Sequence, residues 1–113
     1  MKPVAVGLVA IALAGSAVAA EKPVRFWNLT SETVTSLRLA PAGSAAFGAD
    51  RAKGDSDGSV DHDERLAIKN VSPGAYDASI GFKSGRSCLV KGLEISAGTV
   101  FSVEEKDLIS CKK

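Results

Sequence analysis

The sequence predicts an all-β fold: a small antiparallel, Ig-like β-sandwich with about six or seven strands and one long acidic loop. Two observations support this prediction. Short segments rich in β-branched and aromatic residues recur along the chain, and turns that contain Gly or Pro separate them. We expect little helix and no internal repeat.

The first twenty residues, 1–20, have the pattern of a cleaved signal peptide. Lys2 supplies a positive start, residues 4–14 form an apolar run, and small residues follow that allow cleavage after Ala19 or Ala20. The apolar run is short for a membrane-spanning helix. We therefore expect a periplasmic or secreted protein without a membrane span.

Residues 21–113 are expected to form a single domain. The whole chain has 14 basic and 13 acidic side chains, and removal of Lys2 with the signal peptide leaves the remainder formally neutral. A nucleic-acid partner would require a basic face. We therefore expect no nucleic-acid binding.

The first strand is expected over residues 24–29, which are rich in β-formers. Phe26 and Trp27 must point to opposite faces of this strand, so one of them lies at a surface or an edge. Trp27 is therefore either an exposed binding anchor or packed under a loop, and packing under a loop is the favoured interpretation.

Residues 33–40 form the second expected strand, which ends at Pro41 because proline cannot donate to a ladder. A loop over residues 45–65 follows. Twenty residues without strand is long for so small a domain, and loops of this kind are usually functional or mobile.

The remaining strands are separated by clear turns. The most regular alternation in the chain places Tyr76, Ala78, Ile80 and Phe82 on one face of a strand. Other strands are expected over residues 66–69, 88–93 and 99–103. The last segment, 104–111, is expected to hold a helical turn, with Leu108 and Ile109 packed inward.

The two cysteines, Cys88 and Cys111, are expected to form a disulfide, since an exported protein meets an oxidising compartment. The bridge closes a loop of about 24 residues, for which chain entropy predicts roughly 3 kcal/mol of stabilisation. A metal-binding or redox pair would favour closer spacing.

Six of the thirteen carboxylates lie within residues 50–64. Numbered from Lys53, the segment partly resembles an EF-hand calcium loop: Asp and Glu occupy four ligand positions, and Gly58 takes the sharp turn. However, Lys53 replaces the first carboxylate, and the flanks lack the pattern of paired helices. A calcium or lanthanide site in another geometry would use Asp55, Asp57, Asp61, Asp63 and Glu64. A solvated acidic loop is the favoured alternative.

Two further resemblances rest on short motifs. The run Val71-x-Pro73-Gly74-x-Tyr76 resembles a turn of prealbumin-like or carboxypeptidase-regulatory-like β-sandwich modules, which implies a fold and no chemistry. More broadly, the chain is similar to small exported bacterial proteins of uncharacterised function. The shared features are Asn28-x-Thr30, Leu37 to Pro41, Phe47-Gly48-x-Asp50, Pro73-Gly74-x-Tyr76-Asp77 and Cys88.

These features favour a protein without catalytic activity. His62 is the only histidine, and no nucleophile stands at a recognisable elbow. We expect an exported binding or accessory module that binds Ca²⁺ or another hard cation through residues 50–64. The alternative is an accessory protein of the cell envelope that recognises a protein partner and has no metal site.

Overall fold

The structure is a computed structural model that describes residues 23–113. The expected signal peptide, residues 1–20, lies outside the described residues. None of the helices in the described part of the chain is long and apolar enough to cross a membrane.

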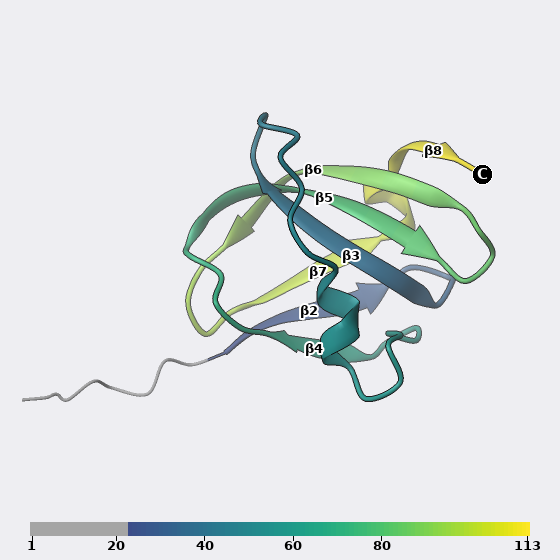
Figure 1. Cartoon of the computed structure of the whole chain (residues 1–113), viewed down its shortest axis with the longest axis horizontal. Helices are drawn as coiled ribbons and strands as arrows, with labels where there is room; N and C mark the ends of the chain where they lie inside the picture. The colour runs from purple at the N-terminus through teal and green to yellow at the C-terminus, as the bar shows by residue number, and fades with distance from the viewer. Residues whose placement is uncertain (1–22) are drawn as a thin grey trace, which may run out of the picture.

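The described residues form seven strands and two short 3₁₀ turns, η1 and η2 (Figure 1). The elements are β2 (Val24–Leu29), β3 (Val34–Pro41), η1 (Arg51–Gly54), β4 (Arg65–Ile68), β5 (Gly74–Phe82), β6 (Ser87–Ile95), β7 (Val100–Glu104), η2 (Glu105–Asp107) and β8 (Ile109–Lys112). The all-β prediction is therefore confirmed.

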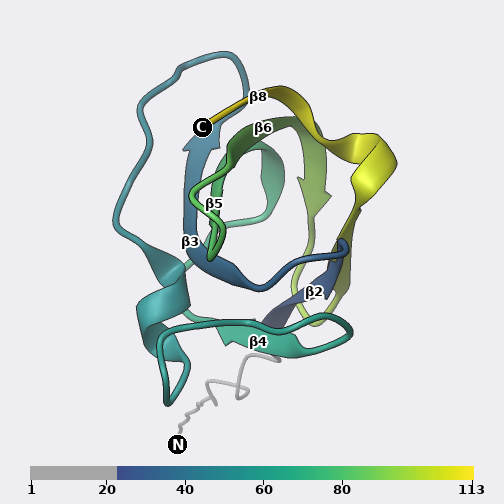
Figure 2. The same cartoon turned by 90° about the vertical axis from the view of Figure 1, so that its right-hand side faces the viewer.

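The strands form two sheets that face each other, as Figure 2 shows along the length of the strands. The three-stranded sheet has the order β4-β2-β7, and the four-stranded sheet has the order β3-β5-β6-β8. Four of the five pairings are antiparallel, but β2 and β7 are parallel. Between β2 and β7 in the sequence, the chain passes through β3, β5 and β6 of the larger sheet. It can therefore return to the smaller sheet at the end where β2 begins, so that β7 runs in the same direction as β2. The expected antiparallel sandwich is correct except at this pair.

The core lies between the sheets and consists of the inward residues of each strand. Phe26 and Phe101 come from paired strands of the smaller sheet, and their ring centroids are 5.6 Å apart. Leu37 and Ile80, which the larger sheet contributes, are fully buried. The alternation predicted for β5 is confirmed for Ala78, Ile80 and Phe82, all of which are buried.

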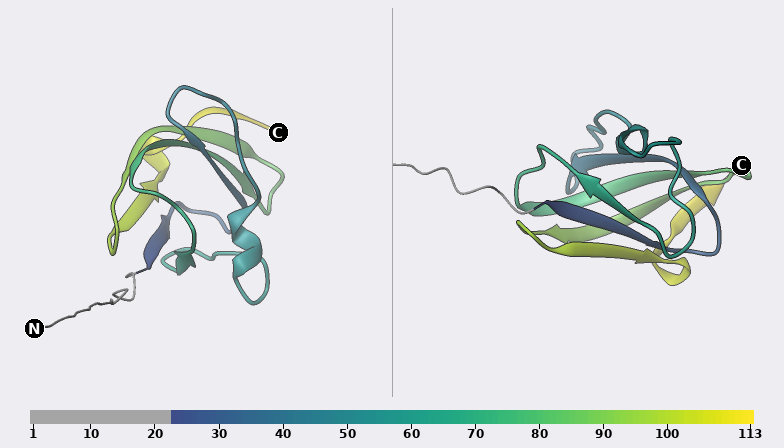
Figure 3. Two further views of the ribbon diagram at one scale, coloured as in Figure 1. Left: turned by 60° about the vertical axis from the view of Figure 1, so that its left-hand side comes forward. Right: turned by 90° about the horizontal axis from the view of Figure 1, so that it is seen from below.

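The acidic loop is part of this core and not an appendage to it. Val60, in the middle of the loop, has no exposed surface and belongs to the core cluster. It forms two backbone hydrogen bonds with Val34, at 2.9 and 2.8 Å. η1 packs against both β3 and β4 (Figure 3). Its Ala52 is fully buried. The expectation of a wholly solvated loop is wrong at these residues.

Substitution of Val60 should therefore destabilise the whole domain. We expect Val60→Ala to lower the free energy of unfolding by about 2 kcal/mol, because it removes two buried methyl groups and leaves a cavity. Urea denaturation measures this change. Ser56→Ala, at an exposed position of the same loop, is the matched control and should change the stability by less than about 0.5 kcal/mol. Equal effects of the two substitutions would mean that the loop does not contribute to the core.

Asp77 occupies an outward position of β5, but the turn after β3 and a bulge in β6 cover its carboxylate. The register shifts between Tyr76 and Ala78, and Asp77 is only 4% exposed. Its oxygens accept hydrogen bonds from the backbone N–H groups of Gly43 and Gly92, at 2.9 and 3.1 Å, and from Lys91 Nζ at 3.2 Å. Both glycines have left-handed φ values, 80° and 71°, which favour glycine.

The hydrogen bond from the Gly43 N–H, followed by the one from Gly92, lowers the pKa of Asp77, and Lys91 acts in the same direction. The folded state therefore favours the charged carboxylate. Its contribution to stability is present above the ordinary pKa of 3.8 and is lost as the pH falls through the lower folded-state value. Asp77→Asn should lower the melting temperature at pH 7, and the difference from the wild type should shrink in acid. A difference that is independent of pH would contradict this assignment.

In the C-terminal segment, the expected helical turn is confirmed as η2. Leu108 is half-buried and packs against the core, as expected. Ile109 is 44% exposed, so its expected inward packing is wrong. It is the first residue of β8, an edge strand with four exposed residues.

Candidate functional site

The carboxylates of the acidic loop mostly accept hydrogen bonds from the protein itself. Asp50 caps η1: its Oδ1 accepts from the N–H of Ala52 and also from the N–H of Leu37 on β3, both at 2.9 Å. Asp50 therefore connects the loop to an edge of the larger sheet.

Asp55 and Asp57 stabilise successive turns. Asp55 Oδ1 accepts from the N–H of Asp57 at 3.2 Å, and Asp57 Oδ1 accepts from the N–H and Oγ of Ser59, at 3.1 and 3.0 Å. A side-chain hydrogen bond with Asp55, followed by those from Ser59, lowers the pKa of Asp57. These two carboxyl groups are neighbours, and both lie on the surface side of the loop.

Asp61 and Glu64 close the end of the loop. Asp61 Oδ1 accepts from Thr33 Oγ1 at 3.0 Å, and Glu64 Oε1 accepts from the N–H of Asp61 at 2.7 Å. Asp63 contacts the first strand and not the loop: its Oδ1 accepts a hydrogen bond from the indole Nε1 of Trp27 at 2.9 Å.

The structure does not bring the five predicted ligands together. Within residues 23–113, no group of three or more His, Cys, Asp or Glu side chains is arranged to hold a metal ion. Asp55 and Asp57 are close to each other, whereas the carboxylates of Asp61, Asp63 and Glu64 contact Thr33, Trp27 and the loop backbone.

His62 is also engaged by the backbone. Its Nδ1 lies 2.7 Å from the carbonyl oxygen of Thr30. Because a carbonyl oxygen only accepts, Nδ1 must carry the proton in this contact. The histidine therefore fastens the loop to the turn after β2.

Trp27 is the anchor of a distinct surface. Its indole is half-buried, and the guanidinium of Arg65 lies over the ring, 4.0 Å from the centroid. Arg65 is the cross-strand neighbour of Trp27 in the β2-β4 ladder, and Asp63 is two residues earlier in the chain. The favoured interpretation, in which Trp27 packs under a loop, agrees with the contact to Asp63. Arg65, which covers the ring, was not identified from the sequence.

The outer side of the three-stranded sheet forms the Trp27 face. Its members alternate with the buried residues of β2, β4 and β7. Arg25 lies between Ala67 and Val100, and Trp27 lies between Arg65 and Ser102. The Trp27 face is defined here as Arg25, Trp27, Arg65, Ala67, Val100 and Ser102.

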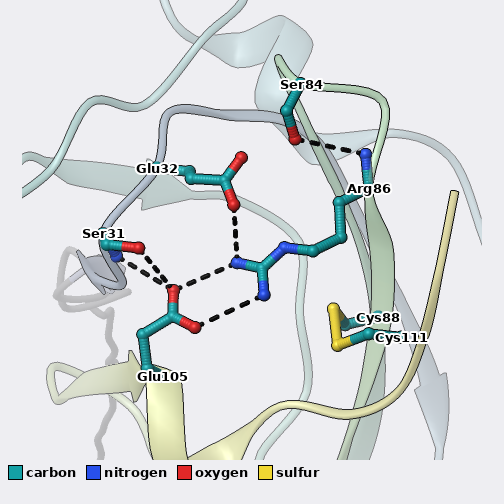
Figure 4. Close-up of a disulfide and its surroundings, with 7 residues drawn as sticks. All are labelled: Ser31, Glu32, Ser84, Arg86, Cys88, Glu105 and Cys111. Atoms are coloured by element: carbon teal, nitrogen blue, oxygen red, sulfur yellow. Dashed lines mark hydrogen bonds and ion pairs between the residues drawn. A yellow bond between two sulfur atoms is a disulfide. The ribbon is translucent and has the colours of Figure 1, made fainter.

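A second polar cluster, which sequence reasoning also missed, joins the two sheets (Figure 4). Arg86 forms ion pairs with Glu32 at 2.8 Å and with Glu105 at 3.0 Å. Glu105 also accepts from the N–H and Oγ of Ser31. The hydrogen bond from Arg86, followed by the one from the Ser31 N–H, lowers the pKa of Glu105, and the same bond to Glu105 raises the pKa of Arg86. The cluster lies close to a disulfide between Cys88 and Cys111. This disulfide confirms the predicted pairing of the two cysteines. Because the charges of Arg86, Glu32 and Glu105 pair with one another, the cluster is interpreted as a structural link between the two sheets.

A hollow of about 410 Å³ lies where β2 begins and β4 ends. Its walls include the aliphatic residues Val24, Ile68 and Val71, and Lys69 is the only titratable side chain among its lining residues. These residues do not supply the pair of acid and base groups that hydrolytic catalysis uses.

The comparisons give no relative: no known family, curated protein or solved structure matches the chain.

Proposed function

We propose that this protein is an exported, non-enzymatic binding module that recognises a protein partner through the Trp27 face. The observation that carries the proposal is that two neighbouring side chains fix the orientation of the Trp27 indole. Asp63 fixes the indole N–H, and Arg65 stacks over the ring, yet Arg65 itself stays exposed. Tryptophan and arginine are the residue types that most often dominate the energy of protein interfaces.

The acidic loop then has a positioning role. Asp63 has a left-handed φ of 69°, and its N–H donates to the carbonyl of Asn28 at 2.6 Å. Val60 and Asp50 fasten the same loop to β3. The loop therefore holds the carboxylate of Asp63 in place under the indole N–H.

Photo-crosslinking in the cell tests this proposal. A photoreactive amino acid replaces the exposed Ala67 on the Trp27 face, and the full-length chain is expressed in its native organism. We expect a discrete crosslinked protein adduct that disappears when Trp27→Ala is added. Thr35, exposed on the opposite sheet, is the matched control position and should give no adduct. Identical adducts from positions 67 and 35 would contradict the proposal.

Cation binding remains a separate prediction from the sequence, and the adjacent carboxyl groups of Asp55 and Asp57 favour it. Calcium should then raise the melting temperature, and Asp57→Asn together with Glu64→Gln should abolish that rise. A rise that survives both substitutions would place the cation elsewhere. No rise with either calcium or a lanthanide would remove the cation role.

A further inference from the structure

The Trp27 face carries cations that no carboxylate neutralises within the described part of the chain. The ion pairs among the described residues involve Arg86 and Lys91, which lie elsewhere, and neither Arg25 nor Arg65 takes part in one. Both are exposed. Three acidic residues adjoin the face: Asp63, which is bonded to the indole, Glu64, which accepts from the Asp61 N–H, and Glu104, which follows Ser102 in the outward row of β7.

The stacking of Arg65 on Trp27 prepares this guanidinium for a ligand. A guanidinium has five N–H donors in a planar fork that matches a carboxylate, and stacking on an aromatic ring restricts its motion. Because side-chain ordering is one cost of association, a guanidinium already held in place binds with less loss of entropy.

The geometry of the face also fixes a spacing. Arg65 is opposite Trp27, and Arg25 is opposite Ala67, so the two arginines are diagonal neighbours in the β2-β4 ladder. Diagonal neighbours in an antiparallel pair are about 7–8 Å apart. Carboxylates at positions i and i+2 of an extended segment are about 7 Å apart. An extended acidic segment therefore matches both cations at once.

The apolar members of the face indicate what kind of molecule carries those carboxylates. Val100 is 44% exposed, and it lies beside Arg25 in the same row as the exposed Ala67. A valine and an alanine offer contact area to apolar side chains, whereas a polyuronate presents hydroxyl groups. The mixture of cations and aliphatic surface favours a polypeptide.

We propose that the Trp27 face binds an extended acidic segment of a partner protein, in which two carboxylates on alternate residues flank apolar side chains. Arg65 takes one carboxylate through its guanidinium fork, Arg25 takes the second, and Val100 contacts an apolar side chain. This inference rests on the proposed function, because it specifies the chemistry of the same surface.

Tryptophan fluorescence tests the inference, since Trp27 is the only tryptophan of the chain. The probe is a synthetic peptide in which two glutamates alternate with threonines, followed by valine. We expect a saturable change in emission that weakens as salt is added. Arg65→Gln should weaken binding at least about tenfold, as loss of a charge-assisted contact predicts. The affinity of Arg65→Lys should lie between those of the wild type and Arg65→Gln, because lysine keeps the charge but lacks the forked guanidinium.

Three controls accompany the titration. Arg38→Gln, which removes an exposed arginine from the opposite sheet, should leave the affinity unchanged. Arg65→Gln alters the emission of Trp27 itself, so affinities are taken from titration midpoints and repeated by calorimetry. Circular dichroism shows that each variant is folded.

Three outcomes would overturn the inference: equal binding of a peptide with glutamine in place of glutamate, tighter binding of alginate or of anionic lipid vesicles, or unchanged affinity in Arg65→Gln. These outcomes differ from failure of the proposed function. A crosslinked partner at position 67 without binding of the acidic peptide would refute the partner chemistry alone. Absence of both would refute the two proposals together.

Discussion

Asn28→Ala is expected to lower the free energy of unfolding by about 3 kcal/mol. Asn28 is fully buried, and its side chain makes four hydrogen bonds. Nδ2 donates to the carbonyl oxygens of Glu32 and Val60, at 2.9 and 2.8 Å. Oδ1 accepts from the N–H and Oγ1 of Thr30, at 3.0 and 2.6 Å. Removal of the amide takes away the acceptor of the buried Thr30 N–H, at a cost of about 1–3 kcal/mol for an unsatisfied group. It also removes one of two hydrogen bonds from the carbonyl oxygens of Val60 and Glu32, which still accept from the Val34 N–H and from Thr30 Oγ1.

Chemical denaturation measures this loss, and two further variants separate its causes. Asn28→Asp keeps the acceptor for Thr30 but places an oxygen opposite the two carbonyl oxygens, so we also expect marked destabilisation. Thr35→Ala, at an exposed site on β3, is the control for loss of a polar side chain and should have little effect. If Asn28→Ala were no more destabilising than Thr35→Ala, the network would not hold the loop to the sandwich.

This network explains why the anchoring of the acidic loop was not predictable from the sequence. Asn28-x-Thr30 is typical of a turn, which it does form, but Nδ2 of Asn28 reaches Val60, 32 residues later in the chain. Val60 is a single apolar residue in a polar run, so no periodicity marks it as core. Only the pairing of Val60 with Val34 across the fold shows that it is buried.

The strands, by contrast, were largely predictable because their signals are local. In β5, inward and outward residues alternate, and the turns on both sides contain glycine. The parallel pairing of β2 with β7 was not predictable, because it depends on how the intervening strands fold. The burial of Asp77 was not predictable for a related reason, since the groups that cover it come from the turn after β3 and from a bulge in β6.

The candidate site was predictable only in part. Trp27 was recognised as either a binding anchor or a residue packed under a loop, and the structure shows both a loop contact and an exposed arginine above the ring. Arg65 carries no local signal, because it lies at the start of a short strand, 38 residues after Trp27. Its importance depends on the register of β2 against β4.

Loss of the disulfide is expected to lower the free energy of unfolding by roughly 3 kcal/mol, through the larger conformational freedom of the unfolded chain. Cys88 and Cys111 are 23 residues apart in sequence and join β6 to the edge strand β8. The double variant Cys88→Ala and Cys111→Ala should match the reduced wild type in urea denaturation. Both should also show a larger m-value than the oxidised protein, because the unfolded chain without the bridge exposes more surface.

The position of β8 makes a second outcome informative. All four of its residues are exposed, and two residue pairs, Ser87–Lys112 and Leu89–Ile109, hold it to β6. If the bridge acts only on this edge, reduction should accelerate amide exchange in residues 109–112 while the free energy of global unfolding stays constant. That result would contradict the chain-entropy account, because a bridge that restrains the unfolded ensemble must change the stability of every strand that unfolds with it.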